Sequence, residues 1–278
     1  MHAFSYLWCY AVKMYILVFT CLNIRAVHME LLPNMTSAAV LEAFIRFCNQ
    51  YGLPDNIYSD NAGSFIQTTA IMNEALCESE FSRYLEENSI RHIKIPLYSA
   101  WVGSAWERVI RIIKTCLHKS IGRRVLDYFQ YITILSDIAF SINSRPLTYR
   151  CSSDNSLDVI TPNSFLMPGV SKTLRFGTIV GSELTFVGRK EVIDSLGRRE
   201  DIVDRFKEAW FDSYLLSLRE NDRDCYNDDF EDRISVGDVI LISSSTDTRP
   251  FWHLGKVIKL LTGDDGCTRC AEILRHDG

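Results

Sequence analysis

Regularly spaced cysteines are missing from this sequence of 278 residues. Its nine cysteines are odd in number and follow no repeated interval, which excludes the disulfide framework of a small secreted domain. Cys267 and Cys270 form one close pair, but no second Cys/His pair at ligand spacing accompanies them, so a zinc site is not favoured there. Cysteines inside apolar runs instead indicate reduced thiols that pack as small hydrophobic side chains.

Acidic residues are missing from the first 29 positions, and Glu30 is the first of them. Residues 3–22 are mostly apolar, a composition shared by signal peptides and membrane spans. Lys13 interrupts this run, no small-residue cleavage site closes it, and its aromatic and β-branched side chains favour strands. We therefore expect buried strands here and no membrane contact, with a membrane-tethered protein as the alternative from another functional class.

The net charge of −5 is unevenly distributed along the chain. Residues 191–233 contain 14 Asp and Glu against 7 Lys and Arg, a local balance of −7, so the rest of the chain is at +2. Because the basic residues cluster outside the acidic segment, the overall acidity does not exclude a nucleic-acid partner.

The order of strand and helix patterns predicts a mixed α/β sheet covered by helices. Two β-rich runs, 14–21 and 25–32, flank a short polar turn and predict a hairpin. A helical period follows over 36–52, in which Thr36 or Ser37 can cap the start and Gly52 marks the end. We further expect a short strand into Asp60, helices at 66–77 and 80–88, a strand at 91–97, and long helices at 104–120 and 127–143.

The remaining segments are predicted as follows. Residues 98–104 form a loop with Gly103 as its hinge, and residues 151–177 are rich in turns. A helix covers 192–220, and the acidic stretch 220–233 is a solvated linker. Short strands around Gly-Asp turns finish the chain and suggest a small β-barrel.

Two carboxylates stand at positions suited to chemistry. Asp60, in "NIYSDNAGSF", ends a strand where open α/β sheets place functional groups, although it could simply hydrogen-bond its own turn. Glu107 opens "ERVIRIIKTCLHK", in which Arg111, Lys114 and His118 follow at i+4, i+7 and i+11 and so share its helix face. This face is either a solvated basic surface or a site that holds a divalent metal beside the phosphates of a nucleic acid.

The motifs "IYSDNAGSF", "GSAWERVIRIIK" and "NSRPLTY…DVITPNSFLMPG" resemble the integrase core of retroelements, in particular that of Pao/BEL-type retrotransposons. "FTCLNIRAVHMELL" is similar to the strand pair before the family's active aspartate, and "VGDVILI…WHLGKVIKLLTGDDGCTR" to the small barrel after its core. The resemblance implies a ribonuclease-H-like core with flanking helices over 1–170, a helical and acidic linker over 171–231, and an SH3-like β-barrel over 232–278.

The same resemblance implies DNA strand transfer that depends on Mg²⁺ or Mn²⁺. Asp60 and Glu107 match the second aspartate and the glutamate of the family's catalytic, metal-holding triad. Asn61, Arg111 and Lys114 match its DNA-binding positions. The expected partners are DNA and further copies of the chain, and the expected location is the nucleus.

The family's first catalytic aspartate has no counterpart here. It belongs on the strand before the hairpin, where "MHAFSYLWCYAV" contains no acidic residue, and no His/Cys zinc domain precedes it. Glu30 is a poor substitute because its strand is the wrong one, and His28 is expected to pack within that strand. Mg²⁺ needs several oxygen ligands in near-octahedral geometry, so we expect a truncated, weak or inactive integrase, with a non-catalytic DNA-binding module as the alternative.

Overall fold

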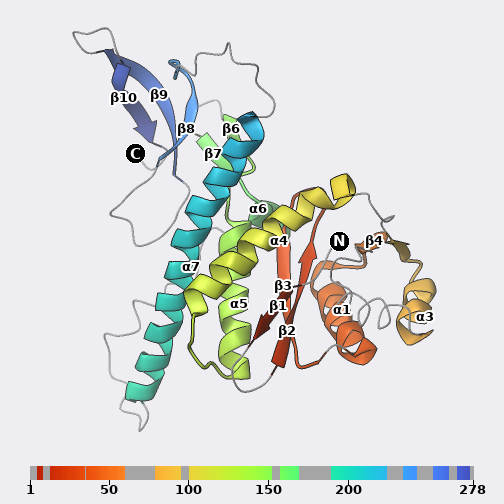
Figure 1. The fold of residues 1–278 in the computed structure, drawn as a ribbon. Helices are drawn as coiled ribbons and strands as arrows, with labels where there is room; N and C mark the ends of the chain where they lie inside the picture. The colour runs from red at the N-terminus through yellow and green to blue at the C-terminus, as the bar shows by residue number, and fades with distance from the viewer. Residues whose placement is uncertain are drawn as a thin grey trace. The chain divides into compact units, whose positions relative to one another are not determined.

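The computed structural model describes residues 5–8, 13–34, 36–59, 79–94, 100–151, 157–168, 189–223, 234–242, 253–262 and 268–275. They form a mixed α/β architecture (Figure 1). The chain divides into two compact units, the first made of residues 1–143 and 170–210, the second of residues 144–169 and 211–278. The domain boundaries at 170 and 231 remain predictions from the sequence.

The first unit contains a three-stranded antiparallel sheet in the order β1-β2-β3. Strand β2 (Lys13–Thr20) and strand β3 (Val27–Leu32) form the predicted hairpin, and β1 (Ser5–Trp8) pairs with the other edge of β2. The apolar run near the N-terminus therefore contains two strands, as expected. None of the helices within the described ranges has the length and apolar character that a bilayer crossing requires.

Helix α1 (Ser37–Tyr51) confirms the predicted helix together with both of its end signals. The Thr36 side chain accepts a hydrogen bond from the N–H of Ala39, which satisfies one of the free amides at the helix start. Gly52 ends the helix at φ +88°, a conformation that favours glycine, and its N–H donates to the carbonyl of Cys48 at 2.8 Å.

Strand β4 (Asn56–Ser59) and strand β5 (Arg91–Lys94) form a separate parallel pair, with helix α3 (Ser79–Glu87) preceding β5. The single mixed sheet expected from the sequence is therefore divided into two hydrogen-bonded sheets within the described residues. Strand order depends on pairing between distant segments, which periodicity does not specify. The helix predicted at 66–77 lies outside the described residues.

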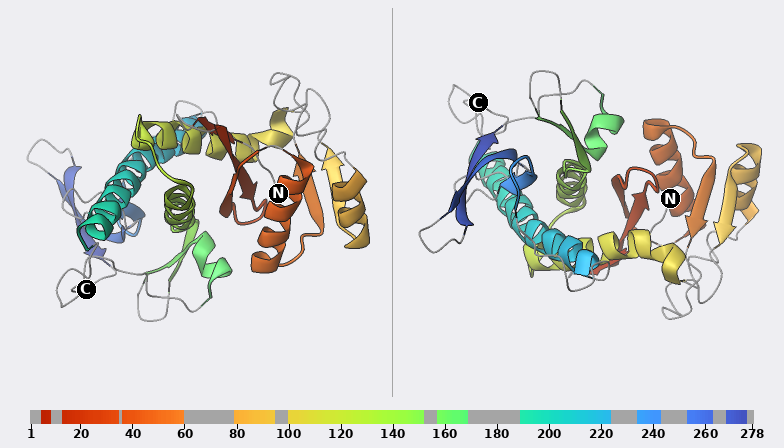
Figure 2. Two further views of the ribbon diagram at one scale, coloured as in Figure 1. Left: turned by 90° about the horizontal axis from the view of Figure 1, so that it is seen from below. Right: turned by 90° about the horizontal axis from the view of Figure 1, so that it is seen from above.

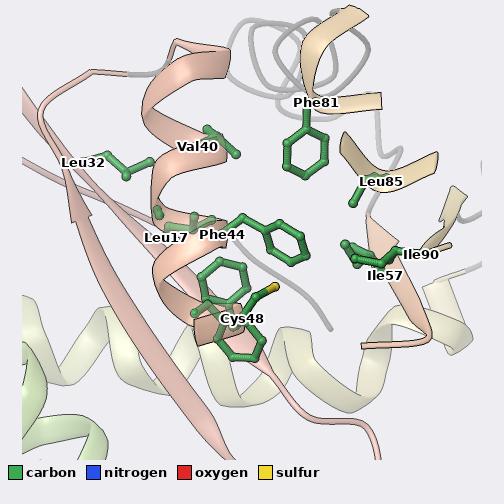
Figure 3. Packing of buried hydrophobic residues seen from close by; sticks show 12 residues of the cluster. Leu17, Leu32, Val40, Phe44, Cys48, Ile57, Phe81, Leu85 and Ile90 are labelled. Atoms are coloured by element: carbon green, nitrogen blue, oxygen red, sulfur yellow. The ribbon is translucent and has the colours of Figure 1, made fainter. Parts of the chain in front are cut away.

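One hydrophobic cluster joins the two sheets (Figure 3). It includes Leu17 of β2, Phe44 of α1, Ile57 of β4 and Phe81 of α3, all at most 9% exposed. The rings of Phe44 and Phe81 meet edge to face at 5.6 Å. Because each such side chain contributes about 1.5–3 kcal/mol on burial, this packing holds β4 beside α1 although β4 and β2 share no ladder.

Helix α4 (Ala100–Ile121) and helix α5 (Tyr128–Asn143) also pack against the antiparallel sheet β1–β3. Figure 2 shows β1–β3 between α1 and α5, with α4 against β1. The loop predicted over 98–104 is wrong from residue 100 onward, because α4 already begins there and Gly103 lies within its first four residues. A single glycine costs a helix only about 1 kcal/mol relative to alanine, which the packing of this 22-residue helix outweighs.

Helix α7 (Arg189–Arg223) confirms the helix predicted at 192–220 and extends beyond it. Residues 220–223, expected to belong to the solvated linker, are helical, since neither Pro nor Gly interrupts the pattern there. In the segment predicted as turn-rich, the second unit has β6 (Thr148–Cys151) paired antiparallel with β7 (Leu157–Ile160), then α6 (Pro162–Leu166). These elements are too short for a clear periodic signal.

The second unit also contains an antiparallel sheet in the order β8-β9-β10. Its strands are β8 (Val239–Ile242), β9 (His253–Thr262) and β10 (Thr268–Arg275). Ile273 and Ile242 pack over Gly255, where an added Cβ would lie 2.2 Å from Ile273 Cγ2. The described strands confirm the predicted β structure, whereas closure into an SH3-like barrel remains a prediction.

Candidate metal and nucleic-acid site

Helix α4 has the two faces that its sequence predicts. Glu107, Arg111 and His118 are exposed and Lys114 is half-buried, all along one side of the helix. The opposite side belongs to the core, in which Trp106, Ile110, Ile112, Ile113, Cys116 and Leu117 are at most 8% exposed. The packed side fixes the rotation of the helix, so the carboxylate and the basic side chains are presented together on the other side.

Lys114 differs from an ordinary surface lysine. Partial burial removes water from its ammonium group and lowers the pKa of Lys114 below its usual value. A phosphate beside this group would restore the lost charge stabilisation, and the attraction is stronger in a partly desolvated position than in bulk water. Lys114 is therefore suited to an anionic ligand.

Strand β4 ends at Ser59, one residue before Asp60. Its parallel partner β5 ends level with it, since Ser59 is paired with Lys94. The sequence thus correctly predicts a strand that leads into the aspartate. Asp60 and Asn61 themselves lie outside the described residues, so their approach to Glu107 remains a prediction.

The first catalytic aspartate of the family pattern has no counterpart on β1, whose residues are Ser, Tyr, Leu and Trp. This strand contacts α4, the helix that carries Glu107. No group of three or more His, Cys, Asp or Glu residues in the described ranges is arranged to hold a metal ion. A hard divalent cation needs several oxygen ligands, so Glu107 alone would not hold one, and the participation of Asp60 remains a prediction.

Glu30 has a structural role on β3. Its Oε1 lies 3.0 Å from His28 Nε2, while Arg46 of α1 contacts its Oε2 through two nitrogens, each at 2.9 Å. Burial alone would raise the pKa of Glu30, but the hydrogen bonds from His28 and Arg46 outweigh it and lower the pKa. Because β2 separates β3 from β1, these contacts support the view that Glu30 does not replace the missing aspartate.

His28 packs as predicted. The centroid of its ring lies 5.9 Å from the ring centroid of Phe19, 5.6 Å from that of Phe47 and 5.2 Å from that of Tyr51. It is therefore part of the aromatic packing between β3 and α1. Of the free cysteines in the described ranges, Cys48 and Cys116 are buried as expected, whereas Cys21 is half-buried and Cys270 is exposed.

Three exposed or half-buried cations near the same face of α4 are not among the site residues that the sequence predicts. Arg108 and Lys119 lie beside the row that begins at Glu107, and Arg123 follows just after the helix ends. The sequence pattern that could have identified Arg108 and Lys119 is their spacing of eleven positions, which is also the spacing from Glu107 to His118.

Comparison with protein families gives one partial match. Residues 196–278 match a model described as a family of unknown function (DUF5641). This region includes most of α7 and the sheet β8–β10. No curated protein is similar to the chain.

Among solved structures, similar chains come from retroviral integrases. A chain of the simian T-cell lymphotropic virus intasome bound to a PP2A regulatory subunit is 17% identical at a TM-score of 0.45, covering 66% of this chain. This chain spans only 59% of that one. The magnesium complex of the HTLV-2 integrase catalytic core in its dimeric form is 19% identical at a TM-score of 0.39, covering 54% of this chain and 87% of its own.

The catalytic core of BIV integrase is a further similar structure. It is 16% identical at a TM-score of 0.41, and the match covers 59% of this chain and 91% of that one. All three TM-scores are below 0.5.

Proposed function

We propose that this chain derives from a Pao/BEL-type retrotransposon integrase and binds DNA through a ribonuclease-H-like core. The observation that carries this proposal is the exposed face of α4. There Glu107 heads a row that continues with Arg111 and Lys114, while the other face is fixed in the core. A carboxylate beside cations on a rigid helix is suited to holding a metal ion next to a phosphate backbone.

The order of elements around this helix supports the proposal. Three antiparallel strands are followed by α1, by a strand that ends just before Asp60, by a parallel strand and then by α4. In this order the motif around Asp60 and the motif around Glu107 follow elements that can bring them to one edge of the core. The C-terminal sheet, proposed to close as an SH3-like barrel, provides a second DNA-binding unit in this account.

Asp60 and Glu107 are the residues that would hold Mg²⁺ or Mn²⁺. When bound, such an ion supplies a lowered pKa for the attacking oxygen and stabilisation of the charge that develops on the phosphate. Arg111 and Lys114 neutralise neighbouring phosphates and Asn61 orients the backbone, so the DNA is positioned before any reaction begins.

The proposed catalytic activity is weak or absent. β1 contacts α4 but contains no acidic residue, so the first catalytic aspartate of the family pattern is missing from the strand that should carry it. This observation also favours the second candidate function, a non-catalytic DNA-binding module. Assembly as a homo-oligomer and a nuclear location are further parts of the proposal, supported by the family resemblance of the motifs.

DNA binding can be measured by fluorescence anisotropy of a labelled duplex at several salt concentrations. We expect an affinity that falls steeply with salt and is weakened in Arg111→Ala/Lys114→Ala. The matched control is Arg205→Ala/Lys207→Ala, which removes the same charge from two ion-paired residues of α7. An affinity that is insensitive to salt, or equal losses in both double variants, would contradict the proposed site.

A strand-transfer assay with Mg²⁺ or Mn²⁺ then separates the two candidate functions. Weak product that disappears in Asp60→Asn indicates a residual integrase. DNA binding without any product indicates the non-catalytic module. Robust activity that Asp60→Asn and Glu107→Gln leave unchanged would place the reaction elsewhere in the chain.

A further inference from the structure

A second row of basic residues lies beside the row that begins at Glu107. Arg108 and Lys119 are separated by eleven positions, the same interval as Glu107 and His118, so they lie along the same direction of the helix. Thr115, between them, is exposed, and its hydroxyl donates to the carbonyl of Arg111 at 3.0 Å. Arg123 follows two residues after the end of α4 and is also exposed.

Several cations elsewhere in the first unit are held in ion pairs with acidic side chains. Among the described residues, no ion pair involves Arg108, Lys119 or Arg123. In contrast, Arg124 lies 2.6 Å from Asp201 and also donates to the carbonyl of Ser120. Three cations of α7 are likewise paired, Arg199 with Asp137, Arg205 with Asp201 and Lys207 with Asp204.

Arg108, Lys119 and Arg123 are therefore available to bind an anionic ligand along α4. An anion that spans these cations gains a favourable interaction with each of them. The ligand must be long, because the rise of an α-helix places Lys119 about 18 Å along the axis from Glu107. That length corresponds to roughly five phosphates of one DNA strand.

We propose that Arg108, Lys119 and Arg123 extend the DNA-binding surface along the whole exposed side of α4. The duplex is then held from the site at Glu107 to the C-terminal end of the helix. This inference rests on the proposed function, because it assigns further phosphate contacts to the same DNA. Arg124, held by Asp201, is not part of the surface.

The salt dependence of DNA affinity tests this extension. Each phosphate contact contributes about 0.9 to the slope of log affinity against log salt, so Arg108→Ala/Lys119→Ala/Arg123→Ala should lower the slope by roughly 2 to 3. The matched control is Arg83→Ala/Arg205→Ala/Lys207→Ala, which removes three cations that have acidic partners. We expect the control to keep the wild-type slope.

A wild-type slope in the first triple variant, or an equal loss in the control, would overturn the extension. Should the first variant lose its helical circular dichroism signal, Arg108→Lys/Lys119→Arg/Arg123→Lys provides the second variant. It conserves every charge and should retain the slope, and a lost slope with intact folding would overturn the assignment to phosphate contacts.

Failure of the extension is distinguishable from failure of the proposed function. If the wild-type protein has no salt-dependent affinity for duplex DNA, both fail. If Arg111→Ala/Lys114→Ala weakens binding while the first triple variant binds as the wild type does, only the extension fails. Heparin, a polyanion other than DNA, provides a further comparison. If Arg108→Ala/Lys119→Ala/Arg123→Ala lowers the affinity for heparin but leaves the affinity for duplex DNA unchanged, the assignment of the surface to DNA is contradicted.

Discussion

The side-chain amide of Asn143 makes two hydrogen bonds with the backbone of Val27, which is 116 positions away in the sequence. Asn143 Nδ2 donates to the Val27 carbonyl and Asn143 Oδ1 accepts from the Val27 N–H, both at 2.7 Å. The last residue of α5 thus completes the hydrogen bonding of a strand residue on β3. Asn143 is only 3% exposed, so water cannot easily replace these bonds.

Replacing Asn143 by Ala should therefore destabilise the protein. Two buried backbone groups of Val27 would lose their partners, and we expect the free energy of unfolding to fall by about 2–4 kcal/mol. Urea unfolding followed by circular dichroism measures the change. Asn49→Ala, at an exposed position of α1, is the control and should stay within about 0.5 kcal/mol of the wild type. Equal effects of the two substitutions would contradict the structural role.

The contacts of Glu30 predict a pH dependence of stability. The pKa of Glu30 is lowered in the folded state from its usual value of 4.5, so the folded protein favours the ionised form. Its stabilisation is present above about pH 4.5 and is lost as the pH falls through the lowered pKa. We expect Glu30→Gln to be less stable at neutral pH and to lose less stability in this acidic range.

Urea unfolding at several pH values measures this difference. Glu42→Gln, an exposed carboxyl of α1, is the control and should retain the pH dependence of the wild type. Parallel stability curves for Glu30→Gln and the wild type would show that the pair formed by Glu30 and Arg46 does not contribute as proposed.

Two glycines should respond to the same substitution in opposite directions. Gly255→Ala places a Cβ 2.2 Å from Ile273 Cγ2 and 2.8 Å from Ile242 Cδ1, and the resulting overpacking should cost about 1–3 kcal/mol. Gly197→Ala adds a methyl group in open space on α7 and should stabilise this helix by about 0.5–1 kcal/mol. Thermal unfolding compares both variants with the wild type, and a change of the same sign in both would contradict the packing around Gly255.

The local features of the fold follow from the sequence, whereas the long-range ones do not. Thr36 and Gly52 mark the ends of α1 because capping depends on a few neighbouring residues. Periodicity likewise identifies the exposed side of α4. It does not reveal the hydrogen bonds between Asn143 and Val27, because their partners are specified only by the tertiary structure. The separation of β4 and β5 from the antiparallel sheet has the same origin.

The lowered pKa of Lys114 predicts that the affinity for DNA falls as the pH rises in the alkaline range. Its pKa is lowered by burial in the free protein, and a bound phosphate favours the charged form and raises that pKa again. Affinity should be full below the lowered pKa and should decline as the pH rises through it. Anisotropy titrations between about pH 7 and 10 measure this decline, which Lys114→Arg should abolish because arginine stays charged. A decline that persists in Lys114→Arg would assign it to another group.

The most direct test of the central claim, that Asp60 and Glu107 converge on one divalent ion beside DNA, is a Mn²⁺ titration of the DNA-bound protein followed by electron paramagnetic resonance. We expect saturable Mn²⁺ binding that is weakened alike by Asp60→Asn and Glu107→Gln and is retained in Glu87→Gln, which changes an exposed carboxylate of α3. Saturable binding unaffected by both substitutions, or no binding to the wild-type complex, would contradict it.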